Sequence, residues 1–350
     1  MQIRKTLRAL SLCRTLTLGG HITVCKSCGV ESISYNSCRN RHCPKCQVTN
    51  KERWIIDRES ELLPVPYYHM VFTLPHYFNV LLPEFDKEIY NALFSASWQT
   101  IQTFAADHKY LEAKTGMVSI LHTWGQQLWL HPHVHCIVPG GGISPAGKWK
   151  SCKYNGKYLF PKRALSTVFR AKFMAALRKS INVPQHIAKQ AFQTKWVVYA
   201  KRPFASPKTV VEYLGRYTHK IAISNHRLID VNENSVTFHY KDYHQAGKKK
   251  QATLTGMEFL RRFSSHILPH GFVRIRHYGF LASKNKKTEL NLAKKDLHLP
   301  EWRKTNYSWV QIAKEKLNYN PDQCPHCKSE SLMIIKVIDP ERGPPINNAI

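Results

Sequence analysis

The chain has 350 residues, 43% of them hydrophobic and 11% aromatic, so it can bury a sizeable core and is not disordered in composition. Lys and Arg number 52 against 23 Asp and Glu, a formal net charge of +29. Such a charge favours a polyanionic partner, most often nucleic acid, although ribosomal, heparin-type or membrane-surface binding would fit the same number. No apolar run approaches the ~18 residues of a membrane helix, and no cleavable signal sequence is evident. We therefore expect a soluble, cytoplasmic protein with no membrane partner.

In chain order, the composition divides the sequence into three predicted domains. Residues 1–62 are dense in Cys, His and Arg, and end in a short basic amphipathic helix over 51–62 that Pro64 would stop. Residues 63–283 alternate strand-like and helix-like stretches and form the predicted catalytic domain. Residues 284–350 are a basic C-terminal region without clear periodicity.

The middle segment has the mixed pattern of an α+β fold. Its predicted strands are 67–74, 117–127, 133–138, 196–200 and 235–240, and its predicted helices are 86–107, 164–181 and 207–219. Strands and helices are interspersed with hairpin-length connections, which favours an α+β sheet over a regular βαβ winding.

The cysteines of the first segment indicate a metal site. Six of the 10 cysteines fall between positions 13 and 46, and without a secretory signal they should stay reduced. Cys25 and Cys28 form one CxxC pair and Cys43 and Cys46 another, a set that can hold a tetrahedral structural Zn²⁺. The alternative is a redox CxxC pair.

Four further side chains lie between or beside these two pairs. They would suffice for a second zinc ion, although the same residues could instead pack or form hydrogen bonds. They are Cys13, His21, Cys38 and His42. The sequence therefore predicts one or two structural zinc ions. Near the other end of the chain, Cys324 and Cys327 form a half site that could complete a further zinc centre or stay free.

The sequence His-Pro-His-Val-His over 131–135 suggests a second kind of metal centre. On a strand, His133 and His135 share a face and lie about 6–7 Å apart, so together they can chelate one divalent ion. A third ligand could come from the neighbouring antiparallel strand, where Gln126 is preferred as nearer across the turn and His122 is the alternative. A histidine-rich strand that is merely packed, or that binds zinc, is the competing interpretation.

Two tyrosines and three cations form a candidate nucleophilic site. Tyr213 and Tyr217 are four residues apart and so share one face of the predicted helix, a spacing that is more often found in a core. Arg216, His219 and Lys220 surround the phenols with positive charge, which suits a nucleophile that attacks a phosphate.

Further basic residues are candidates for contacts to phosphates. Residues 241–304 contain 15 Lys or Arg and 5 Asp or Glu, interleaved with aromatic residues that could stack on bases. For each candidate, the alternative is that the side chain simply lies on a solvated surface. The candidates are Lys201, Arg202, Lys248, Lys249 and Lys250.

Five ordered blocks of the sequence resemble the insertion sequence 91 family of bacterial transposases. They are SYNSCRNRHCPKCQ (34–47), HMVFTLPH (69–76), LHTWGQ with HPHVHCIVPGGG (121–142), WVVYAKRPF (196–204) and YLGRYTHKIAISNHRL (213–228). The resemblance covers about residues 10–285. It implies an HUH-type antiparallel sheet flanked by helices, with a small N-terminal zinc-binding domain, in a bacterial protein of the nucleoid.

The resemblance also implies a reaction. His133 and His135 would hold a catalytic Mg²⁺ or Mn²⁺, and Tyr213 and Tyr217 would form 5′-phosphotyrosine bonds in rolling-circle transposition. The partners would be single-stranded DNA at the ends of a mobile element and target DNA, with self-association left open. A replication initiator or relaxase would share this chemistry. A zinc-containing DNA-binding module without catalysis, or a nuclease that uses water, are the competing functions.

Overall fold

The structure is a computed structural model that describes residues 2–153, 159–200, 204, 209–211, 213, 215 and 221–341. The chain divides into two compact units, which are described separately. The terminal unit combines Met1–Trp54 with Asn306–Ile350, and the central unit is Ile55–Thr305. Helix α2 (Gln47–Glu59) spans the boundary between them. Among the described residues, no helix is long and apolar enough to cross a bilayer.

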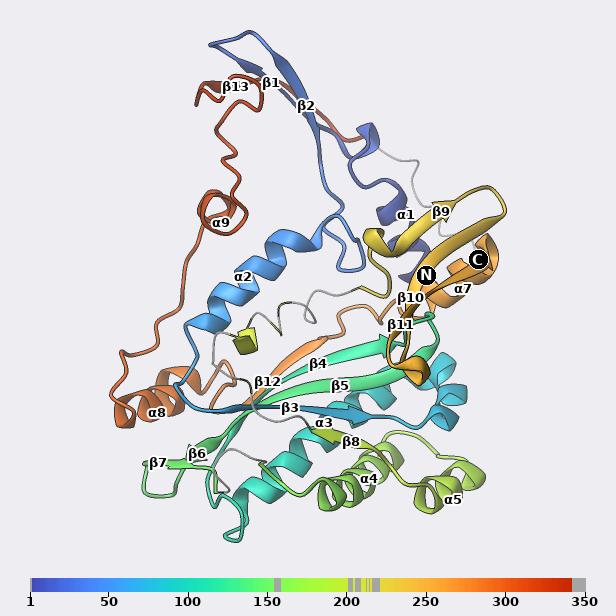
Figure 1. Cartoon of the computed structure of the whole chain (residues 1–350), viewed down its shortest axis with the longest axis vertical. Helices are drawn as coiled ribbons and strands as arrows, with labels where there is room; N and C mark the ends of the chain where they lie inside the picture. The colour runs from blue at the N-terminus through green and yellow to red at the C-terminus, as the bar shows by residue number, and fades with distance from the viewer. Residues whose placement is uncertain are drawn as a thin grey trace. The chain divides into compact units, whose positions relative to one another are not determined.

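The terminal unit is built on a small antiparallel sheet whose strands come from both ends of the chain. Its order is β13-β1-β2, with β1 at Gly20–Cys25, β2 at Glu31–Tyr35 and β13 at Leu332–Ile338. The red β13 therefore lies beside the blue β1 in Figure 1. Two helices, α1 (Gln2–Ser11) and α9 (Trp309–Lys316), and a short 3₁₀ helix at Leu16–Leu18 complete the unit.

The central unit contains a five-stranded sheet in which every neighbouring pair is antiparallel. Its order is β12-β4-β5-β3-β8. The strands are β3 (Tyr67–Thr73), β4 (Gly116–Trp124), β5 (Leu130–Pro139), β8 (Val198–Ala200) and β12 (Ile275–Gly279). The α+β fold and the antiparallel sheet flanked by helices are thereby confirmed.

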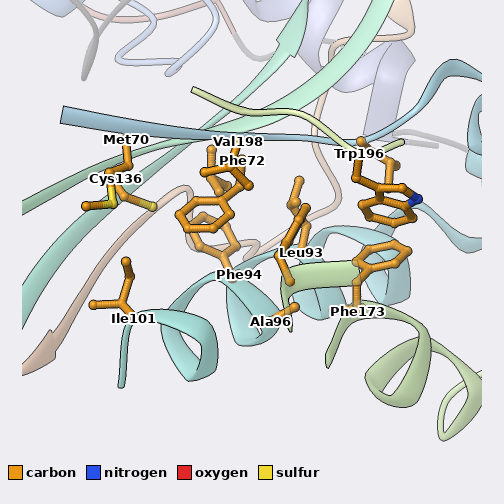
Figure 2. Close-up of a cluster of buried hydrophobic side chains, with 14 of the residues drawn as sticks. Met70, Phe72, Leu93, Phe94, Ala96, Ile101, Cys136, Phe173, Trp196 and Val198 are labelled. Atoms are coloured by element: carbon orange, nitrogen blue, oxygen red, sulfur yellow. The ribbon is translucent and has the colours of Figure 1, made fainter. Parts of the chain in front are cut away.

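Helices cover one face of this sheet and form the main core with it (Figure 1). They are α3 (Leu82–Ala106), which follows a 3₁₀ helix at His76–Leu81, then α4 (Lys162–Arg178) and α5 (Gln185–Gln193). Because side chains alternate along a strand, Phe72 of β3 points toward the helices, where its ring lies 4.9 Å from that of Phe169. Figure 2 shows Phe72, Phe173 and Trp196 in this cluster. Burying each such ring contributes about 1.5–3 kcal/mol.

A smaller sheet, β9-β10-β11, has its own core and holds the turn between β4 and β5. The turn inserts Leu128 beside Phe238 in that core, and its carbonyl oxygens accept hydrogen bonds from Arg227, Arg262 and His266. The elements of this region are a 3₁₀ turn at Asn225–Arg227, β9 (Leu228–Val231), β10 (Ser235–Asp242), a 3₁₀ turn at Tyr243–Gln245, β11 (Lys248–Thr255) and α7 (Gly256–Ser264). The remaining elements of the central unit are β6 (Gly141–Ile143), β7 (Trp149–Ser151), a π-helical turn at Lys286–Leu290 and α8 (Asn291–Asp296).

The C-terminal segment is more structured than its composition suggested. It contains α8, α9 and β13, and its last part belongs to the terminal unit. The helix expected over 51–62 begins earlier, at Gln47, and ends at Glu59. The helix expected over 207–219 lies largely outside the described residues, although those described between 209 and 215 are helical. The domain limits at 62 and 283 stay a prediction.

Candidate metal centre and tyrosine site

Three histidines meet on the sheet face that lies opposite the helices. The register pairs His122 of β4 with His133 of β5, and His135 is two residues further along β5 on the same face. One ring nitrogen from each of the three lies within 4.8 Å of the other two, so a single divalent ion could bind all three. The ring centroid of His135 lies 4.6 Å from that of His122 and 4.9 Å from that of His133.

The orientation of these imidazoles is fixed by their neighbours. His133 Nδ1 lies 2.6 Å from the carbonyl oxygen of His131, so Nδ1 carries the proton and Nε2 presents a lone pair. The His122 ring stacks on Trp124 with centroids 4.7 Å apart. His122 and His135 are buried, at 3% and 8% exposure, which keeps their rings from rotating into solvent.

Gln126, the preferred third ligand in the sequence prediction, is not brought to this cluster. Its Nε2 donates to Tyr243 Oη at 3.3 Å, and its Oε1 accepts from the backbone N–H of Lys241 at 3.2 Å. The strand pairing becomes irregular between His122 and Trp124, and the β10-β11 region holds the turn that follows. The structure therefore brings His122, the alternative, to His133 and His135.

A fourth histidine connects this cluster to a tyrosine. His69 of β3 is 2% exposed, and its Nε2 lies 2.8 Å from His135 Nδ1. Its Nδ1 lies 3.4 Å from the Tyr213 hydroxyl oxygen, and the phenol ring also packs on Phe204 with centroids 5.0 Å apart. Sequence reasoning missed His69. Alternation along the strand places His69, Val71 and Thr73 on one face of β3. This identifies His69 as a neighbour of the histidine cluster only once β3 is known to pair with β5.

The other predicted residues of the tyrosine helix lie outside the described residues. These are Arg216, Tyr217, His219 and Lys220, and the same is true of Lys201 and Arg202. The three lysines of β11 are described. Lys248 and Lys249 are exposed, whereas Lys250 forms an ion pair with Asp242 at 2.8 Å.

The structure does not assemble the predicted quartet of Cys25, Cys28, Cys43 and Cys46. It separates the two CxxC pairs and gives each pair different partners. Cys43 and Cys46 meet Cys13 and Cys38, with Sγ–Sγ distances of 3.4 Å for Cys13–Cys46 and 3.7 Å for Cys38–Cys46. All ten cysteines lie in described segments, and none forms a disulfide. Four thiols at this spacing match a structural zinc site.

Cys25 and Cys28 instead meet Cys324 and Cys327. Hydrogen bonds from the hydroxyls of Ser329 and then Ser331 lower the pKa of the Cys25 thiol to about 5. His21 and His42, predicted for a second zinc ion, belong to neither cluster. The sequence spacing identified the CxxC turns, but the two cysteines that the structure places beside Cys25 and Cys28 lie almost 300 residues away, where spacing arguments do not apply.

Comparison with known proteins matches both units to transposase families. A family model described as "Transposase zinc-binding domain" matches residues 1–74, and one described as "Putative transposase" matches residues 116–288. No solved structure matches the chain.

Two curated relatives are similar along nearly the whole chain. "Putative transposase y4qJ" of Sinorhizobium fredii is 39% identical, covering 98% of this chain and 91% of the relative. "Transposase for insertion sequence element IS801" of Pseudomonas savastanoi pv. phaseolicola is 28% identical, covering 92% of this chain and 81% of the relative. With its zinc-binding domain, its cysteine clusters and its antiparallel sheet, the chain belongs to the insertion sequence 91 family of transposases.

Proposed function

We propose that this transposase nicks and rejoins single-stranded DNA through a 5′-phosphotyrosine on Tyr213, in rolling-circle transposition of the element that encodes it. One observation carries the proposal. The Tyr213 hydroxyl is joined through His69 to His135, a member of the three-histidine cluster, by contacts of 3.4 and 2.8 Å. A nucleophile and a candidate metal centre are thus two hydrogen bonds apart.

The reaction is an exchange of phosphodiester bonds. The Tyr213 oxygen attacks phosphorus, a bond forms between them, and the bond from phosphorus to the 3′ oxygen breaks. The phenol loses its proton and the departing 3′ oxygen gains one, so no net proton or energy source is needed. The later attack of a 3′ hydroxyl on the phosphotyrosine reverses these changes and rejoins the strand.

The residues of the cluster fit a divalent ion. His122, His133 and His135 would hold Mg²⁺ or Mn²⁺, and imidazole ligands suit Mn²⁺ better than the oxygen-preferring Mg²⁺. When bound, such an ion supplies Lewis-acid polarisation of the scissile phosphate.

His69 has a defined role in this arrangement. If His135 offers its Nε2 lone pair to an ion, its Nδ1 carries the proton and donates to His69 Nε2. The His69 proton then sits on Nδ1, which faces the Tyr213 oxygen. In this state His69 donates a hydrogen bond to the phenol oxygen. It therefore orients and stabilises the developing phenolate, and the phenol proton leaves by another route.

Exposed rings beside the site support a single strand as the substrate. Trp129 and Tyr243 are 51% and 71% exposed, and both belong to the region around the β4–β5 turn. Arg262 lies 3.4 Å from the centroid of the Trp129 ring and is paired with Glu258, so it helps to fix this ring in place. Unpaired bases stack on such exposed rings.

In the terminal unit, we propose that Cys13, Cys38, Cys43 and Cys46 hold a structural Zn²⁺.

The test incubates the purified protein with labelled single-stranded oligonucleotides that span the ends of its element, plus Mg²⁺ or Mn²⁺. We expect an adduct that resists SDS and is lost in Tyr213→Phe and His133→Ala, and kept in Tyr319→Phe, a control at a 54% exposed position. Tyr217→Phe reports whether a second tyrosine acts. Cleavage without an adduct would indicate a nuclease that uses water, and binding without cleavage would indicate a DNA-binding module.

The role of His69 needs its own readout. His69→Ala should slow adduct formation by about 10²-fold while Mn²⁺ binding, measured by calorimetry, changes less than in His133→Ala. His69→Gln, whose amide N–H can still donate, should recover part of the rate. Equal losses of rate and of metal affinity in both variants would assign His69 to holding the metal ligand alone.

A further inference from the structure

The second cysteine cluster joins two parts of the chain that are far apart in sequence. Cys25 Sγ lies 3.5 Å from Cys327 Sγ, 302 residues away, and Cys28 Sγ lies 3.8 Å from Cys324 Sγ, 296 residues away. All four Sγ atoms lie within 4.8 Å of one another. Thiolates around a tetrahedral zinc ion, at Zn–S bonds of about 2.3 Å, lie about 3.8 Å apart. A disulfide would instead require a separation of about 2.05 Å.

The two CxxC turns have the same local structure. In each, the residue after the second cysteine has a positive φ, 72° at Gly29 and 65° at Lys328. Each of these residues donates its backbone N–H to the carbonyl oxygen of the first cysteine, with N–O distances of 2.8 Å for Gly29–Cys25 and 3.0 Å for Lys328–Cys324. A positive φ is uncommon outside glycine, so the turn at Lys328 is imposed by its surroundings. Two matched turns that face each other are what one tetrahedral ion requires.

Other contacts around the cluster favour thiolate ligands. The Ser329 and Ser331 hydroxyls each lie 3.3 Å from Cys25 Sγ, close enough for hydrogen bonds to sulfur. The Lys26 backbone N–H donates to the Ser331 carbonyl oxygen at 3.0 Å, which ties the first turn to the second.

The strand that follows the second turn has little apolar burial to hold it. β13 pairs with β1 from Leu332–Cys25 to Ile338–Gly20, yet most of its side chains are exposed. Gly19, at φ 67°, leaves room for this pairing, because a Cβ there would lie 2.4 Å from the Ile338 carbonyl oxygen. A strand held chiefly by backbone hydrogen bonds is marginal in water, so a further constraint is needed.

We infer that Cys25, Cys28, Cys324 and Cys327 bind a second structural Zn²⁺, which fastens the C-terminal strand to the N-terminal hairpin. Four Zn–S bonds form, the thiol protons go to solvent, and nothing is oxidised or reduced. The match to the zinc-binding family ends at residue 74 and includes only half of these ligands. The inference does not depend on the reaction proposed for Tyr213.

The first experiment counts zinc in the full chain, purified under reducing conditions. We expect two zinc ions per chain, one in Cys324→Ser, Cys327→Ser, one in Cys43→Ser, Cys46→Ser, and none when the four substitutions are combined. Cys152→Ser, a control at a cysteine outside both clusters, should keep two. Cys327→His, which replaces one zinc ligand by another, should also keep two. One zinc in the wild-type chain, or two in Cys324→Ser, Cys327→Ser, would overturn the inference.

A second measurement does not rely on the zinc count. A specific protease site inserted after Lys304 allows the chain to be cut in the coil that precedes α9. We expect the C-terminal fragment to stay bound to the rest of the protein after cleavage, and to be released by a chelator or by Cys324→Ser, Cys327→Ser. A fragment that remains bound equally well in that variant would show that zinc does not fasten it.

Discussion

The terminal unit and the central unit bury different kinds of side chain. In the central unit, aromatic and aliphatic residues from the sheet, α3 and α4 form one continuous core. Among the described residues of the terminal unit, the buried hydrophobic side chains are mostly thiols: Cys13, Cys25, Cys43, Trp54, Ile312, Ala313 and Cys324. A unit with so little apolar burial needs another source of stability. The comparison indicates that metal stabilises one unit and the hydrophobic effect stabilises the other.

Removal of zinc should produce the largest difference in stability between the two units. Structural zinc contributes on the order of 10–16 kcal/mol of binding free energy, more than a small unit can lose and remain folded. We expect a chelator at neutral pH to abolish hydrogen-exchange protection in β1, β2 and β13 and to leave β3, β4 and β5 protected. Uniform loss of protection in both units would contradict the comparison.

Phe169→Ala is the complementary change in the central unit. Phe169 is fully buried against Phe72 and Trp196, so its truncation should lower the free energy of unfolding by about 3–5 kcal/mol. Urea denaturation measures this loss, and the zinc content should not change. Phe192→Ala is the matched control, because Phe192 is 46% exposed on α5 and its loss should cost far less.

Acid should destabilise the central unit through a buried histidine. Burial lowers the pKa of His266 to about 4, below the ~6.5 of an unfolded chain. Between these values the unfolded chain binds more protons, so stability falls as the pH drops from 6.5 to about 4. We expect His266 to contribute a loss of about 2–3 kcal/mol over that window, measured by pulsed hydrogen exchange across a urea series. His266→Gln should make the dependence less steep, and an equally steep profile in the variant would exclude His266 as a source of it.

The smallest expected effect concerns two adjacent lysines of β11. Lys249 is exposed, whereas Lys250 forms an ion pair with Asp242, so of these two lysines Lys249 is the one available to a DNA phosphate. Lys249→Gln should weaken binding of single-stranded DNA and reduce its slope against log salt by about 0.7, while Lys250→Gln should leave the slope unchanged. Fluorescence anisotropy over a salt series distinguishes the two. Identical slopes in all three proteins would show that Lys249 does not contact a DNA phosphate.

The sequence predicted local geometry better than long-range partners. Alternation along 131–135 placed His133 and His135 on one face because the period of a strand is fixed. The sequence could give His122 only as an alternative ligand. The irregular pairing before Trp124 and the packing of the β4–β5 turn against the β9-β10-β11 sheet depend on tertiary contacts, which the sequence pattern does not specify. His69 and the pairing of Cys25 with Cys327 depend on strand neighbours, which periodicity does not specify. The order β12-β4-β5-β3-β8 was unpredictable for the same reason.

The pairing of β1 with β13 also sets an order of events during synthesis. Cys25 and Cys28 leave the ribosome early, but their partners at 324 and 327 follow after almost 300 further residues, roughly 15–60 s later at about 5–20 residues per second. Through that interval the first hairpin lacks its neighbouring strand, while the sheet of the central unit can already form. A chain whose translation stops before β13 thus has a central sheet that can form, but an N-terminal hairpin that lacks its neighbouring strand and half of the second cysteine cluster.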